Sequence, residues 1–126
     1  MAKTYPKMTD DEKNRYWETY FSTRDTLRFA IVDLDVAASS AKFSSDAATI
    51  LAEKLRLESE LAKLLNESTA VAAGEVAITP PSEGEIDKIK RLADAVDRLT
   101  VTANTYSKAV NLAGQALDAY AKIRSA

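Results

Sequence analysis

The chain has 126 residues, of which 46% are hydrophobic and 29% charged, a balance typical of one folded domain and too apolar for a disordered chain. The net charge of −2 argues against nucleic-acid binding, and the absence of Cys and His excludes thiol nucleophiles, Ser-His-Asp relays, disulfides and nearly all zinc sites. Only three Gly and three Pro occur, which disfavours a β-sandwich or barrel and favours helices.

The residue types and sequence patterns that are absent limit the chemistry and the location that we expect for the protein. We expect no catalytic residue, no metal and no cofactor, and therefore a protein that is not an enzyme. No apolar run approaches the roughly 20 residues that a membrane-spanning helix needs. The first residues lack the apolar stretch of a signal peptide, so we expect a cytoplasmic protein.

The first half of the chain predicts two long helices. Residues 1–8 form an N-terminal arm, and Thr9 with Glu12 has the spacing of a capping box that begins a helix over about 9–43. Neither Gly nor Pro occurs from residue 7 to residue 73, and one helix of that length is too long for a compact domain. We expect a break at 44–46, with a weaker break near Ser22 that would split the first helix in two.

The second half predicts a loop and one more long helix. The second helix runs over about 46–72 and ends at Gly74, which begins a loop over 74–82. Ser82 and Glu85 form a second capping-box pattern, which begins a helix over about 83–124. The β-branched residues at 100–102 and Gly114 lie inside this helix, and either could bend it.

Apolar residues recur along these segments at alternating spacings of three and four, the period of packed helices. The pattern predicts an all-α protein: an elongated antiparallel bundle of three long helices with coiled-coil-like packing, in one domain over 9–126. A break near Ser22 would make it a four-helix bundle.

Two helices carry a second apolar stripe beyond the one that a bundle core requires. Both stripes fall in the second halves of the first and third helices, which run in the same direction when three helices are joined up, down, up. We therefore expect the stripes to meet at one end of the bundle as an exposed interface. The alternative is that a broken first helix buries both stripes inside a four-helix monomer. The predicted interface consists of Phe29, Val32, Val36, Phe43, Val101, Leu112, Ala119 and Ile123.

Charged residues interrupt the apolar faces of the first two helices. Antiparallel pairing predicts contact between Asp35 and Lys54, and it places Arg28 near Glu58 or Glu60. One interpretation is that these ion pairs set the helix register. The other is that Arg24 and Arg28 bind an anionic ligand.

Four aromatic residues crowd the start of the first helix: Tyr16, Trp17, Tyr20 and Phe21. We expect them to form core, with any exposed remainder serving as a second partner surface.

The composition and the second stripes together predict a protein-interaction module such as an adaptor, inhibitor, chaperone or immunity-type protein. Its partner is another protein or a second copy of the chain in a homodimer. The alternative is a small-ligand-binding or sensory bundle that uses Arg24 and Arg28. Coating of a lipid or polymer surface is a third interpretation.

Overall fold

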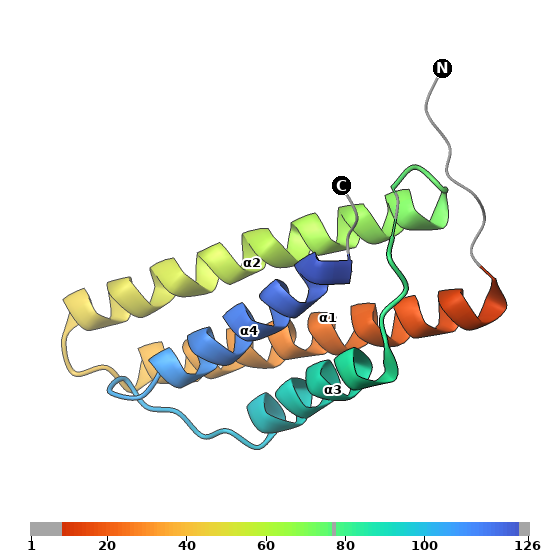
Figure 1. Cartoon of the computed structure of the whole chain (residues 1–126). Helices are drawn as coiled ribbons and strands as arrows, with labels where there is room; N and C mark the ends of the chain where they lie inside the picture. Colours follow the sequence, from red (N-terminus) through yellow and green to blue (C-terminus); the bar gives the residue numbers. More distant parts are fainter. Residues whose placement is uncertain (1–8, 77, 124–126) are drawn as a thin grey trace.

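The computed structural model describes residues 9–76 and 78–123, and Figure 1 shows the path of the chain. Four helices make up the described part: α1 (Asp10–Ser39), α2 (Ser44–Ala72), α3 (Glu83–Asp97) and α4 (Ser107–Ile123). The predicted all-α helical bundle is therefore confirmed. The predicted arm at 1–8 lies outside the described residues.

Helix α1 is continuous, so the predicted break near Ser22 is wrong. The Thr23 hydroxyl donates a hydrogen bond of 2.8 Å to the carbonyl of Thr19, and the Thr26 hydroxyl donates one of 2.7 Å to the carbonyl of Ser22. These bonds satisfy buried hydroxyls inside the helix, so a Ser/Thr-rich stretch does not have to leave the helical conformation. The capping box of Thr9 and Glu12 begins the helix as predicted.

Helix α2 follows after a short turn. It begins at Ser44, two residues before the predicted start, and ends as predicted before Gly74, whose φ of 75° is in the left-handed region. The amide of Glu75 donates to the carbonyl of Ala70 at 2.9 Å, which closes the end of the helix in the manner of a Schellman motif.

The predicted third helix over 83–124 is wrong, because it is two helices separated by residues 98–106. The break falls at the β-branched patch that the sequence offers as a point of bending. Within it, the Thr105 hydroxyl accepts the Thr102 amide at 2.8 Å, and the Thr102 hydroxyl accepts the Asn104 amide at 3.2 Å. These local bonds satisfy backbone amides between the end of α3 and the start of α4, in place of helical hydrogen bonds. The capping box of Ser82 and Glu85 is confirmed at its start.

The four helices run up, down, up, down, with α1 in contact with each of the other three (Figure 1). Because α4 turns back, its end lies beside the 74–82 loop, where the Thr79 amide donates to the Ile123 carbonyl at 2.7 Å. The segment after α3 instead reaches the α1–α2 turn, where the Ala103 amide donates to the Ser40 hydroxyl at 3.3 Å. The end of α4 and the α1–α2 turn therefore lie at opposite ends of the bundle, which contradicts the prediction that the second halves of the first and third long helices meet at one end.

Small side chains form much of the core between α1 and α4. Ala30 and Ala37 on α1 are fully buried, as are Ala109, Ala113 and Ala116 on α4. Alanine lets two helices approach closely, so α4 packs tightly against the middle of α1. This packing leaves the opposite side of α1 outside the core.

Candidate interaction surface

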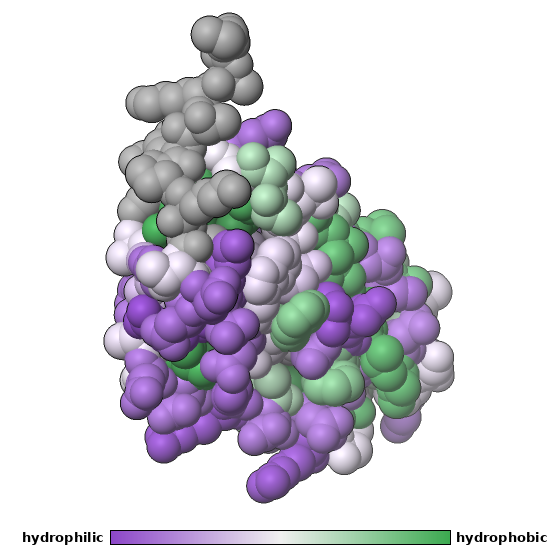
Figure 2. All heavy atoms as spheres, turned by 90° about the vertical axis from the view of Figure 1, so that its right-hand side faces the viewer, coloured by the Kyte–Doolittle hydropathy of each residue, from purple (hydrophilic) through white to green (hydrophobic). Residues whose placement is uncertain are grey.

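Every large apolar side chain that is exposed in the described part of the chain belongs to α1, α2 or the turn between them. These residues are Phe21, Phe29, Val32, Val36, Phe43, Leu51, Leu55 and Leu65. In the end view of Figure 2, apolar colour gathers toward the right-hand side, whereas the left and lower parts of the surface are mostly hydrophilic. A gathering of exposed apolar side chains on one side of a molecule is typical of a site where another molecule packs.

The α1 half of the predicted interface is exposed, as expected. Phe29 is 37% exposed, Val32 60%, Val36 57% and Phe43 67%. The first three follow one another at spacings of three and four, so they form a line along one side of α1, away from the buried Leu27.

The other half of the predicted interface is not on the surface, so this part of the prediction is wrong. Val101, Ala119 and Ile123 are buried, and Leu112 is partly buried. The cause is the break at 98–106, which lets α4 fold back and pack these side chains into the core. The expected junction of two stripes at one end of the bundle therefore does not form.

A second exposed stripe lies instead on α2, at Leu51, Leu55 and Leu65. In the sequence these leucines belong to a broad apolar arc on the second helix, a pattern typical of a helix packed on two sides. Helix α2 packs mainly on α1, so part of that arc stays exposed. The arc is wider than packing against one neighbouring helix requires, and this width is the sequence pattern that could have indicated an exposed stripe on α2.

The predicted contact between Asp35 and Lys54 is present and joins the two stripes into one face. The Lys54 ammonium lies 3.0 Å from the Asp35 carboxylate and 3.7 Å from Glu58. The hydrogen bond that the Lys54 ammonium donates to the Asp35 carboxylate raises the pKa of Lys54 above its ordinary value. Val32 lies one helical turn before Asp35, and Leu51 lies one turn before Lys54, so apolar side chains flank the ion pair on both helices.

The two arginines on this face have different surroundings. Arg24 lies 4.8 Å from the centre of the Phe21 ring and 3.4 Å from the Asp25 carboxylate. Arg28 is exposed and makes no ion pair with Glu58 or Glu60, which pair instead with Lys54 and Lys63. The ion pairs expected between Arg28 and those glutamates are therefore not formed.

The aromatic cluster is mostly core, as expected. Tyr16 and Tyr20 are buried, Trp17 is partly buried, and Phe21 is 45% exposed. The Tyr16 and Tyr120 hydroxyls share a buried hydrogen bond of 2.8 Å, which ties α1 to α4. Burial raises the pKa of Tyr16 to about 12 and also raises the pKa of Tyr120. Phe21 is the member of the cluster that extends the exposed face.

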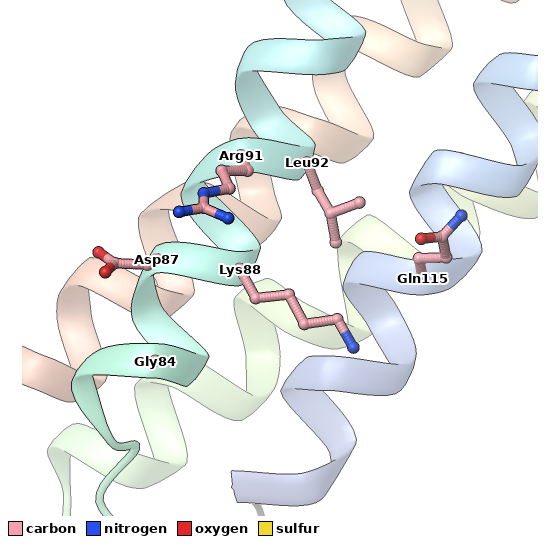
Figure 3. Close-up of a pocket in the computed structure, with 6 residues that line it drawn as sticks. All are labelled: Gly84, Asp87, Lys88, Arg91, Leu92 and Gln115. Carbon is pink, nitrogen blue, oxygen red and sulfur yellow. The ribbon is translucent and has the colours of Figure 1, made fainter.

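Two grooves lie elsewhere on the bundle. Figure 3 shows the groove of about 380 Å³ between α3 and α4, where Lys88 extends toward α4 and Asp87 and Arg91 point away from it. The other, of about 440 Å³, lies between α2 and α4, where Arg56 and Lys63 pair with acidic neighbours on α2. Both grooves mix charges of both signs, so neither points to one class of ligand.

No group of three or more potential metal-ligating side chains occurs within residues 9–76 and 78–123. In that same part of the chain, no helix combines the length and the apolar character needed to cross a membrane. No family model, curated protein or solved structure is significantly similar to this chain. Its function is therefore inferred from the surface alone.

Proposed function

We propose that the protein is a non-enzymatic interaction module that binds another polypeptide through the outer face of α1 and α2. The observation that supports this proposal is the confinement of all exposed large apolar side chains of the described residues to this face. Burying such side chains contributes roughly 1.5–3 kcal/mol each when they become fully buried. A few of them at the centre of an interface are enough for stable binding.

The alternative of an anionic-ligand site has less support. Arg24 already pairs with Asp25 and lies over Phe21, so its guanidinium is partly occupied. Arg28 then stands as a single exposed cation, and one exposed cation holds an anion weakly in water.

The test compares the wild-type chain with Val32→Glu/Leu55→Glu, which puts two charges on the face. Ala95→Glu is the matched control, because Ala95 is exposed on α3 and lies outside the face. Each tagged chain is captured from the cells that naturally make it, and its own association state is measured by sedimentation. We expect binding, to itself or to another polypeptide, to persist in the control and to fall at least about tenfold in the double variant. Equal binding by the folded double variant and the control would rule the face out.

A further inference from the structure

We propose that the partner on this face is a second copy of the same chain, related by a two-fold axis that runs along the helices between α1 and α2. This inference rests on the proposed function, because it names the occupant of the same face. Two features support it: the ion pair at the centre of the face, and the matching heights of its two apolar stripes.

The ion pair makes the face complementary to itself. Asp35 and Lys54 lie side by side, with the negative group on α1 and the positive group on α2. A two-fold axis parallel to the helices places α1 of one copy over α2 of the other. Asp35 of each copy then faces Lys54 of its partner, so these four charges alternate in sign, with the Glu58 carboxylate 3.7 Å from Lys54 beside them in each copy.

The same charges disfavour the other simple arrangement. A two-fold axis perpendicular to the helices and level with the ion pair would place α1 over α1 and α2 over α2. Asp35 would then face Asp35, and Lys54 would face Lys54, in a partly desolvated interface where like charges repel strongly. The ion pair therefore selects the orientation of the two copies.

The apolar stripes fit the same orientation. Because α1 and α2 are antiparallel and residues 35 and 54 are level, Val36 lies close to the height of Leu51 and Leu55. By the same count, Phe21 lies within about one turn of the height of Leu65. The α1 stripe of one copy therefore meets the α2 stripe of the other at two heights, near Val36 and near Phe21, as in an isologous interface.

The first experiment measures the dimer dissociation constant by sedimentation equilibrium. Asp35→Lys places four positive charges at the centre of the interface, and we expect it to raise that constant at least about tenfold. Asp35→Lys/Lys54→Asp restores alternating charges, and we expect it to return the constant to within about threefold of wild type. Circular dichroism of both variants checks that they are folded.

The second experiment determines the orientation and uses the absence of cysteine in the chain. Val36→Cys and Leu51→Cys are made in separate chains, mixed and mildly oxidised. We expect a disulfide between the two different chains, because α1 of one copy lies over α2 of the other. Cross-linking of Val36→Cys chains to each other in preference would overturn the orientation.

Even weak dimers form at a chain concentration of about 1 mM. A wild-type chain that stays monomeric at that concentration would therefore overturn the proposal that the partner is a second copy. Capture of a different polypeptide that is lost with Val32→Glu/Leu55→Glu would still support the proposed function. The experiments therefore distinguish failure of the homodimer proposal from failure of the proposed interaction face.

Discussion

Asp35 on α1 and Lys54 on α2 lie 19 positions apart in the chain, and their charged groups approach to 3.0 Å. Asp35 is 61% exposed and Lys54 is 24% exposed, so this is a surface pair that water and salt partly screen. Its main contribution to the fold is to align α1 and α2 rather than to stabilise them strongly.

We predict that a double-mutant cycle with Asp35→Asn and Lys54→Gln gives a small favourable coupling. The coupling should shrink in high salt, because added ions screen exposed charges. Urea unfolding at low and high salt, at a concentration where the chain is monomeric, measures it. A coupling that is unchanged by salt would contradict the assignment of a screened surface pair.

The buried hydrogen bond between the Tyr16 and Tyr120 hydroxyls should contribute to stability. Tyr120→Phe leaves the buried Tyr16 hydroxyl without this partner, and we expect it to lower the free energy of unfolding by about 1–2 kcal/mol. The double variant Tyr16→Phe/Tyr120→Phe removes both hydroxyls. It should lower the free energy of unfolding by less than the sum of the two single variants. Strict additivity of the two changes would argue against the bond.

The same tyrosines should make stability fall in alkaline solution. Tyr16 has a pKa of about 12 in the folded chain against an ordinary value of 10.0, so folding favours the neutral hydroxyl. The stability that this provides is fully present below pH 10 and is lost as the pH rises through about 12. The Tyr16→Phe/Tyr120→Phe variant should lose less stability over that range, measured by urea unfolding at each pH.

Asp33 should be slightly destabilising at neutral pH. Burial raises its pKa above the ordinary value of 3.8, and its Oδ2 atom is buried without a hydrogen-bond partner. The stability associated with its neutral form is present below pH 3.8 and is lost as the pH rises through the folded pKa. We expect Asp33→Asn to raise the free energy of unfolding at pH 7 by about 1 kcal/mol. Asp87→Asn, at an exposed position on α3, is the control and should change it much less.

Two glycines should respond in opposite ways to alanine. Gly74 has a φ of 75°, and an added Cβ meets nothing within 4 Å, so Gly74→Ala isolates backbone strain and should cost about 1–2 kcal/mol. Gly114 lies inside α4 with open space around it, so Gly114→Ala should stabilise the protein by about 0.5–1 kcal/mol. Thermal unfolding of both variants tests the contrast, and effects of the same sign would contradict it.

Local features of this protein were predictable because they depend on neighbouring residues. The capping boxes at Thr9 and Ser82 and the helix end at Gly74 follow from hydrogen bonds and dihedral angles within one turn. The contact of Asp35 with Lys54 was also predictable, because a short turn between two antiparallel helices sets their register. The exposed line from Phe29 to Val36 followed from helical periodicity.

Only the tertiary structure decided where the second long helical pattern breaks and what its two halves cover. The apolar spacing continues through residues 99–106, so periodicity alone predicts one helix there. An unbroken helix would leave much of its alanine-rich surface without a partner, whereas folding back at residues 98–106 packs Ala113 and Ile123 into the core. Burial against a helix distant in the sequence outweighs local helical propensity. As a result, the exposed apolar surface lies on the outer face of α1 and α2 and not at the end of the bundle, where the sequence pattern predicts it.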